Sequence, residues 1–357
     1  MTAALPEIIA EPESVTPAWL SKVLAHHGVE ATVADFHATN VGTGQVGQNV
    51  RFALRYSDGE GPASIVGKFA SADPTSRATG VTQNNYLKEV RFYQELKPTL
   101  SIQTPEVLFA AIEPTSHAFC LIMEDLAPAV QGDQITGCSV DEASLALTQA
   151  TRLHAPRWAD PSLNDIEWFG TRSPEQAAMG QQMYQHFFPG FVERYETRLT
   201  AEQIEIARQL GAGFAHWSNG YDGPETVTHG DYRLDNMLFG GPYPLTIVDW
   251  QTPGKGAAMS DVSYFLGAGL PTELRRSHER ELVEAYHQQL MASGVTGYGF
   301  EECWNDYRRF SFSGLLMAVI ASMIVGQTAR GDDMFMAMAT RHAQQAIDLD
   351  AHSFLNP

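Results

Sequence analysis

Apolar and polar residues alternate in several segments of the first third of the chain. Val50, Phe52, Leu54 and Tyr56 occupy every second position and are separated by polar or small residues. An alternation with a period of two predicts a strand with one buried face. We expect strands at 33–41, 49–56, 63–70, 106–112 and 118–124. The sequence therefore predicts a small β-sheet near the start of the chain.

Most of the remaining sequence follows a helical pattern. Thr16 precedes Pro17, which suits the cap and the first position of a helix. Ser139 and Glu142 have the spacing of a capping box at the start of another helix. We expect helices at about 16–27, 82–96, 139–154, 201–218, 272–292, 299–327 and 335–350. A mainly helical region is thus predicted to follow the sheet.

The composition narrows the classes of partner. The chain has 23 basic and 42 acidic residues, a formal net charge of −19, which disfavours nucleic acid and anionic membranes as partners. Its three cysteines form no C-x-x-C pair, which argues against a zinc site and fits a reducing compartment. The apolar stretch 315–325 is shorter than the roughly 20 residues that cross a bilayer, so we expect a buried helix there. Without a recognisable signal peptide, a cytoplasmic protein is expected.

Side chains suited to phosphoryl transfer occur in the middle of the chain. His229, Asp231 and Asn236 have the spacing H-x-D-x-x-x-x-N, and Asp249 ends the next apolar run, beyond a turn at 240–244. The two apolar runs predict short strands around this turn. Asp231 could accept the proton of an attacking hydroxyl, whereas Asn236 and Asp249 carry the hard oxygen ligands that Mg²⁺ prefers.

Together the two motifs resemble the catalytic core of the small-molecule branch of the protein-kinase-like fold. This branch includes aminoglycoside phosphotransferases, choline kinases and ecdysteroid-kinase-like proteins. The motif H-G-D-x-x-x-x-N resembles H-R-D of protein kinases, and V-D-W resembles D-F-G. Gly230 replaces the arginine, and Trp250 and Gln251 replace phenylalanine and glycine. Both replacements are typical of the small-molecule branch and argue against regulation by an activation loop. The resemblance covers about residues 40–270.

A glycine-rich segment lies between two predicted strands. Gly42, Gly44 and Gly47 form a G-x-G-x-x-G pattern. In a dinucleotide-binding dehydrogenase this pattern would open a helix, and the strand after Gly47 argues against that interpretation. Strand, glycine loop and strand resemble the hairpin that covers the nucleotide phosphates in the kinase-like fold.

The resemblance also assigns further nucleotide-binding residues. Lys68 lies in an apolar run and resembles the lysine that holds the α- and β-phosphates. Its expected partner is Glu89 on the following helix, with Glu95 as the alternative. The segment after the fifth predicted strand resembles the hinge between lobes, where backbone groups of Glu124 and Leu126 would bind adenine.

The loop around Asp231 has several expected supporting residues. The resemblance implies that Asn236 and Asp249 hold two magnesium ions and that Arg233 faces the transferring phosphate. Asp235 is expected to stabilise the loop rather than to take part in the reaction. Asp261, at the start of a later helix, would accept hydrogen bonds from the backbone of the catalytic loop.

The resemblance implies an α+β, protein-kinase-like, two-lobed fold, with a small antiparallel sheet in the N-terminal lobe. The N-terminal lobe would comprise residues 1–126 and the helical C-terminal lobe residues 127–357, with nucleotide bound between them. The expected reaction is phosphoryl transfer from Mg-ATP, or GTP, to a hydroxyl of a small molecule. A catalytically silent nucleotide-binding protein is the alternative from another class. A monomer or a homodimer is expected.

The phosphate acceptor is the least determined part of the sequence analysis. Aromatic residues are dense in 156–200, whereas the acidic residues there are scattered. This favours a neutral or weakly charged hydroxylated substrate with an apolar or aromatic body, because a polycation would need converging carboxylates. An aminoglycoside O-phosphotransferase remains the alternative.

Overall fold

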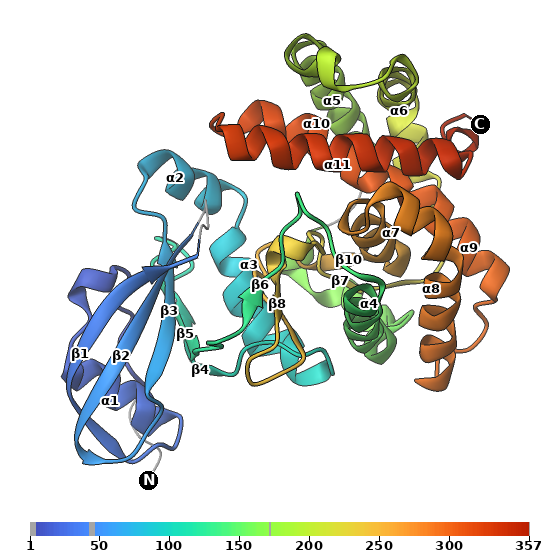
Figure 1. Ribbon diagram of the computed structural model, residues 1–357. Coiled ribbons are helices and arrows are strands. Elements are labelled where there is room, and N and C mark those ends of the chain that lie inside the picture. Colours follow the sequence, from blue (N-terminus) through green and yellow to red (C-terminus); the bar gives the residue numbers. More distant parts are fainter. Residues whose placement is uncertain (1–4, 43–46, 171–172, 357) are drawn as a thin grey trace. The chain divides into compact units, whose positions relative to one another are not determined.

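The computed structural model describes residues 5–42, 47–170 and 173–356. They form two compact units (Figure 1). The first unit contains the chain up to Val130 together with Gly240–Pro253, and the second contains Gln131–Phe239 and the chain from Gly254 onward. The predicted N-terminal lobe ends at residue 126 and lacks the second of the two segments that make up the first unit. Each unit is described separately below.

A five-stranded antiparallel sheet is the basis of the first unit, as predicted (Figure 1). Its strands are β1 (Ala31–Val41), β2 (Gly47–Gly59), β3 (Ser64–Ala70), β4 (Val107–Ile112) and β5 (Phe119–Glu124). The strand order is β1-β2-β3-β5-β4, which places β3 in the centre. Like β2 and β5, this strand is paired on both edges.

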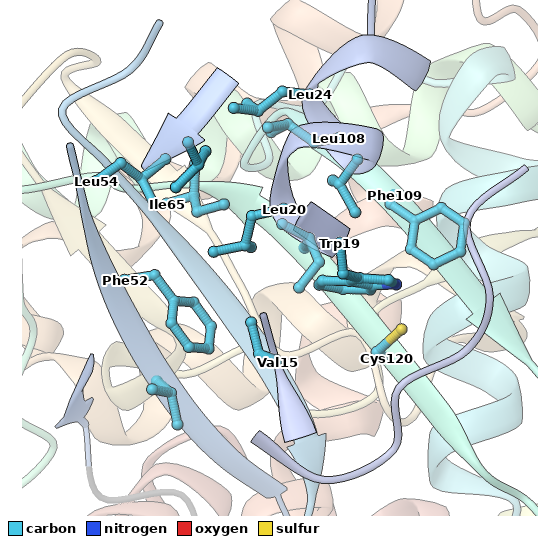
Figure 2. Close-up of a cluster of buried hydrophobic side chains, with 14 of the residues drawn as sticks. Val15, Trp19, Leu20, Leu24, Phe52, Leu54, Ile65, Leu108, Phe109 and Cys120 are labelled. Atoms are coloured by element: carbon cyan, nitrogen blue, oxygen red, sulfur yellow. The ribbon is translucent and has the colours of Figure 1, made fainter. Parts of the chain in front are cut away.

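Helix α1 (Pro17–His26) packs its apolar side against this sheet (Figure 2). Thr16 caps the helix as predicted, since its side chain accepts a hydrogen bond from the Trp19 N–H at 3.2 Å. The Trp19 ring meets Phe109 edge-on, with centroids 6.2 Å apart. Phe52, from the alternating run of β2, is fully buried in the same cluster. The period-two pattern therefore identified the buried face.

The helical part of the first unit differs from the single helix predicted at 82–96. Helix α2 (Pro74–Thr82) ends where that helix was expected to begin, and α3 (Asn85–Arg91) continues into the π-helical turn η2 (Phe92–Leu96). Short 3-10 turns η1 (Pro12–Ser14) and η3 (Lys97–Thr99) and strand β9 (Leu245–Ile247) complete the described elements of this unit.

The second unit is mainly helical. Its helices are α4 (Val140–His154), α5 (Pro174–Tyr195), α6 (Ala201–Asn219), α7 (Ala258–Gly269), α8 (Thr272–Ala292), α9 (Phe300–Arg309), α10 (Ser313–Ile324) and α11 (Ala329–Asp348). Its strands are β7 (Glu225–Thr228), β8 (Met237–Phe239) and β10 (Gly254–Ala257), and β6 (Val130–Gln131) lies at the boundary. Short turns lie at 155–157, 161–165, 167–169, 196–198, 234–236, 310–312 and 351–354. The capping box predicted at Ser139 is present at the start of α4.

Two helix predictions in the second unit need correction. The helix expected at 299–327 is interrupted by a 3-10 turn between α9 and α10. The apolar stretch that forms α10 is also not fully buried, because Met317 and Ile324 are 39% and 53% exposed. No helix within the described ranges has the length and apolar character needed to cross a bilayer.

Candidate active site

Lys68 lies in the central strand β3 and is 6% exposed. Its neighbours Ile65 and Phe69 are fully buried. The Lys68 Nζ lies 2.8 Å from the Glu89 carboxylate and 2.7 Å from Asp249 Oδ1. Burying an ammonium group is costly unless opposite charge compensates for the lost hydration. The two carboxylates provide that compensation.

The structure distinguishes the two glutamates considered as partners of Lys68. Glu89 on α3 is 1% exposed and contacts the ammonium, whereas Glu95 pairs with Arg91 at 2.5 Å. The second carboxylate oxygen of Glu89 accepts a hydrogen bond from Gln251 Nε2 at 3.3 Å. Lys68 is therefore paired with Glu89, and Gln251 ties the same glutamate to the segment that carries Asp249.

The charges of Lys68, Glu89 and Asp249 shift the pKa values of Lys68 and Glu89. Burial lowers the pKa of Lys68, but the charges of Asp249 and Glu89 outweigh burial and hold the pKa above its usual value. Burial raises the pKa of Glu89, and the Lys68 ammonium offsets only part of that rise. Lys68 thus stays charged.

Trp250 anchors the segment that carries Asp249. Its indole ring is fully buried and stacks on Phe92, with centroids 3.8 Å apart and planes within 4° of parallel. The indole Nε1 donates to the Ile247 carbonyl at 3.2 Å. Asp249 has a φ of 66°, in the left-handed region that aspartate tolerates better than most residues. Its side chain, 41% exposed, faces both Lys68 and solvent.

Two of the three predicted loop glycines lie within the described residues; Gly44 does not. Gly42 has a φ of +76°, a conformation that favours glycine. Gly47 begins β2 opposite Ala70, and a Cβ added there would lie 3.1 Å from Lys68 Cε. A larger residue at position 47 would therefore crowd the Lys68 side chain.

Two of the predicted hinge backbone groups are already engaged within the first unit. The Glu124 N–H donates to the Glu106 carbonyl at 2.9 Å, and the Leu126 carbonyl accepts from the Ala129 N–H at 2.8 Å. A nucleobase at this segment would therefore have to bind other backbone groups or share these two.

Asp125, between the two predicted hinge residues, fixes the segment by its side chain. Arg51 donates to both carboxylate oxygens, from Nε at 2.6 Å and from Nη2 at 2.9 Å, and Ser64 donates at 2.6 Å. Burial raises the pKa of Asp125, but these donors outweigh burial and hold it below the usual value. The hinge segment is thereby tied to β2 and to the start of β3.

In the second unit, Asp261 on α7 holds the start of the catalytic loop as predicted. Its carboxylate accepts the His229 N–H at 2.7 Å and the Gly230 N–H at 3.0 Å. His154 on α4 contacts the same carboxylate at 3.2 Å. Gly230 has a φ of +78°, a conformation that favours glycine. The carboxylate thus replaces water as the partner of two backbone groups in the loop.

Asp231 is surrounded by hydrogen-bond donors. Arg233 Nε lies 3.0 Å from both carboxylate oxygens, Asn236 Nδ2 donates to Oδ2 at 2.8 Å, and the Tyr264 hydroxyl donates to Oδ1 at 2.9 Å. Burial raises the pKa of Asp231, but the Arg233 charge and the remaining donors, with His229, outweigh burial and hold the pKa below its usual value. The Asp231 carboxylate is therefore ionised at neutral pH.

Arg233 and Asp235 form part of the same network. The Arg233 guanidinium contacts the Asp235 carboxylate as well as Asp231. Asp235 Oδ1 also accepts the Gln134 N–H at 3.2 Å. The contacts of Asp235 fit the structural role predicted for it. These contacts use Nε and Nη1 of Arg233, so the predicted phosphate-facing role would fall to Nη2 or to a donor released from Asp231.

The two residues expected to bind magnesium, Asn236 and Asp249, both carry side-chain oxygen atoms suited to Mg²⁺. Asn236 is 5% exposed and uses its amide nitrogen to donate to Asp231, so its amide oxygen is the atom suited to a cation. Asp249 offers a partly exposed carboxylate. Among the described residues, no group of three or more His, Cys, Asp or Glu side chains could hold a metal ion. Few protein ligands are typical of Mg²⁺ bound together with nucleotide phosphates.

The family of the chain follows from comparison with known proteins. A family model described as the ecdysteroid kinase-like family matches residues 48–294, which is more than half of the 357 residues. The chain belongs to the ecdysteroid kinase-like family. The match includes Lys68, Asp231 and Asp249. None of the curated proteins matches the sequence significantly.

Solved structures of small-molecule kinases share the fold of this ecdysteroid kinase-like protein. An ethanolamine kinase from Plasmodium vivax aligns with a TM-score of 0.53 and 9% identity, over 90% of this chain and 86% of its own. A candidate aminoglycoside phosphotransferase from Ralstonia eutropha JMP134 aligns at 0.51 and 15% identity, over 92% and 97%. The GDP complex of aminoglycoside 2'-phosphotransferase-IIIa aligns at 0.50 and 12% identity, over 92% and 99%. The fold is the α+β, protein-kinase-like fold.

Several residues of this ecdysteroid kinase-like site were missed by the sequence analysis. Tyr264 contacts Asp231, His154 contacts Asp261, and Gln251 contacts Glu89. Tyr264 lies three positions after Asp261 on one helix, so helical spacing placed both on one face. This was a signal that could have been used. The contacts of His154 and Gln251 depend on tertiary packing.

Replacing Asp261 tests its support of the catalytic loop. Asp261→Ala leaves two loop N–H groups without their partner, so we expect the free energy of unfolding to fall by at least about 1–3 kcal/mol. Urea denaturation would measure the change. Asp333→Ala serves as a matched control, because Asp333 is 56% exposed and pairs with the exposed Arg198. Equal stability of the two variants would contradict the assigned role.

Proposed function

We propose that this protein transfers the terminal phosphoryl group of Mg-ATP or Mg-GTP to a hydroxyl group of a small molecule. The observation that carries the proposal is the buried Lys68, held by both Glu89 and Asp249. A charged lysine in the centre of a sheet destabilises the fold unless it is paired. We interpret the paired Lys68 as a preformed binding group for phosphate. Membership of the ecdysteroid kinase-like family supports a kinase function.

In the first unit, Lys68 would bind the phosphates of the nucleotide. An ammonium group has three N–H donors, and Glu89 and Asp249 engage two directions around Nζ. The third donor can then bind a phosphate oxygen. Asp249 would hold magnesium through its exposed carboxylate, and the chemistry that magnesium supplies is neutralisation of negative charge on the phosphates. Gln251 would keep Glu89 in place while Asp249 changes partners.

In the second unit, Asp231 would orient and deprotonate the acceptor hydroxyl. The acceptor oxygen forms a bond to the terminal phosphorus, and the bond from that phosphorus to the bridging oxygen breaks. The nucleoside diphosphate leaves with the electron pair of that bond, and the hydroxyl proton passes to Asp231. Asn236 would hold magnesium through its oxygen. Arg233 would turn towards the transferring phosphate and stabilise its charge.

The acceptor is proposed to have a sizeable apolar body. Five large hydrophobic side chains are exposed in the described part of the second unit, and four of them, Met179, Met183, Met317 and Ile324, lie on α5 and α10. These two helices pack closely, since a Cβ at Gly190 of α5 would lie 2.8 Å from the Met323 side chain of α10. Apolar surface of this kind gains about 25 cal/mol for each Å² that a ligand covers. The four side chains themselves carry no charge that would pair with a polycation.

Replacing the proposed base should separate catalysis from nucleotide binding. We expect Asp231→Ala to lower kcat by about 100- to 10,000-fold, the usual effect of losing a general base. Nucleotide affinity, measured by calorimetry, should stay within several-fold, because Asp231 is assigned to the acceptor. Asp222→Ala, an exposed aspartate of the same unit, is the control. Turnover of Asp231→Ala near the wild-type rate would refute the mechanism.

Nucleotide binding should require a divalent cation through Asp249. We expect ATP to bind much more weakly in EDTA than with Mg²⁺. Asp249→Asn should remove most of this difference and weaken Mg-ATP binding by about tenfold or more, which is about 1.4 kcal/mol. Asparagine also tolerates the left-handed backbone at this position, so the variant tests charge rather than conformation. Equal ATP affinity with and without Mg²⁺ would contradict this site.

The acceptor class can be tested by measuring ATP consumption with a panel of alcohols. We expect steroid-type and phenol-type alcohols to be phosphorylated with lower KM than kanamycin-type aminoglycosides. Met183→Glu should raise the KM for the apolar alcohols and leave the KM for ATP unchanged. Gln182→Glu places the same charge on the neighbouring exposed residue of α5 and is the control. A clear preference for an aminoglycoside at micromolar KM would establish the antibiotic-kinase alternative instead.

A further inference from the structure

Tyr264 of α7 is 5% exposed and donates its hydroxyl hydrogen to Asp231 Oδ1 at 2.9 Å. The same helix carries Asp261, which holds the backbone of the loop through His229 and Gly230. Helix α7 therefore contacts the loop twice, once at its backbone and once at the side chain of the proposed base. The first contact was predicted from the sequence, and the second was not.

The other donors to Asp231 leave the rotation of its carboxylate less well defined. Arg233 Nε lies 3.0 Å from both oxygens and so does not distinguish them. Asn236 binds only Oδ2, and Tyr264 binds only Oδ1. A carboxylate rotates in a broad torsional well. Tyr264 and Asn236 together fix that torsion, one from each side.

Arg233 is the donor to Asp231 that we expect to move. An ionised carboxylate has about four lone-pair sites, and the contacts from Tyr264, Asn236 and the shared Arg233 hydrogen cover them in this structure. Asp231 can accept a proton only when one of these contacts is released. Arg233 is the donor with a second function in the proposed reaction, at the phosphate. Once Arg233 turns away, Tyr264 and Asn236 remain to hold the carboxylate.

The Tyr264 ring is itself held rigidly. It stacks on His342 of α11, with centroids 5.6 Å apart and planes 21° from parallel. His342 Nδ1 lies 3.2 Å from Gln345 Oε1. A Cβ added at Gly314 would lie 1.9 Å from His342 Nε2, and one added at Gly267 would lie 2.4 Å from Nδ1. Two glycines therefore let the neighbouring helices close on the histidine, so the surface behind the Tyr264 ring is fixed.

We propose that Tyr264 is a positioning residue for phosphoryl transfer, which holds Asp231 in its reactive orientation while Arg233 exchanges the carboxylate for the phosphate. This proposal rests on the proposed function. It explains why a buried tyrosine hydroxyl is aimed at a carboxylate that already has two donors. Tyr264 makes no contact with the reacting atoms in this account, and it acts through Asp231.

The matched variants Tyr264→Phe and Tyr298→Phe test the proposal. Each removes one buried hydroxyl that donates to a carboxylate, but Tyr298, which is 3% exposed, donates to Asp306, at 2.8 Å. We expect Tyr264→Phe to lower kcat by about 10- to 100-fold, the range expected for loss of a hydrogen bond to a charged group, with the KM for Mg-ATP within about twofold. Tyr298→Phe should keep the wild-type kcat. An unchanged kcat in Tyr264→Phe, or an equal loss in both variants, would overturn the proposal.

Crystal structures of the wild type and Tyr264→Phe give a readout that does not depend on activity. We expect the phenyl ring to remain stacked on His342 and the Asp231 carboxylate to rotate or to become disordered. A carboxylate that keeps its orientation in Tyr264→Phe would overturn the proposal. A wild-type protein that phosphorylates none of the alcohols would refute the proposed function, and the crystallographic comparison would still decide whether Tyr264 positions Asp231.

Discussion

A buried ammonium group must be paired with negative charge, and much of the first unit can be understood as the arrangement that pairs Lys68. The central strand places Lys68 inside the sheet, where hydration is lost. Glu89 reaches it from α3, and Asp249 reaches it from the segment after β9. The segments that carry Glu89 and Asp249 are also fixed, because Phe92 follows α3, Trp250 follows Asp249, and the two rings stack on each other. The apolar stack joins the segment after α3 to the segment that carries Asp249.

The second unit follows the same physical rule with the sign reversed. There the buried charge is negative, and hydrogen-bond donors compensate for it. Asp261 takes its donors from the loop backbone, and Asp231 takes them from Arg233, Asn236 and Tyr264. Removing one partner from such a group costs more than the pair contributes, because a buried charge remains without compensation. The catalytic loop is thereby restricted to a narrow set of conformations before any ligand binds.

The elements and residues that could be predicted from the sequence are those that depend on local patterns. Strand β2 follows from alternation, β3 and β5 follow from short apolar runs, and Asp231, Asn236 and Asp249 follow from short motifs whose spacing does not depend on distant packing. The same patterns favoured Glu89 over Glu95 as the partner of Lys68, which the structure confirms, but they did not exclude Glu95. The turn η2 is π-helical, so positions after Arg91 depart from the usual helical phase.

Contacts that join distant elements were beyond the reach of local patterns. Gln251 meets Glu89 across 162 positions, and Arg51 meets Asp125 across 74. The exposure of an apolar helix also depends on tertiary packing. The composition of α10 indicates burial, yet the number of neighbours around it decides whether Met317 and Ile324 are covered.

If the proposed function holds, the residues that transfer phosphate and the residues that select the acceptor use different kinds of interaction. The groups assigned to phosphate transfer are ionic and directional, and each depends on a partner, so a single substitution there disturbs several others. The surface assigned to the acceptor is formed by methionine and isoleucine side chains of α5 and α10, which are non-directional, and methionine is flexible. Substitutions on that surface change shape and apolar area without leaving a buried charge unpaired. The identity of the acceptor can therefore diverge within this fold while Lys68, Asp231 and Asp249 keep the same surroundings.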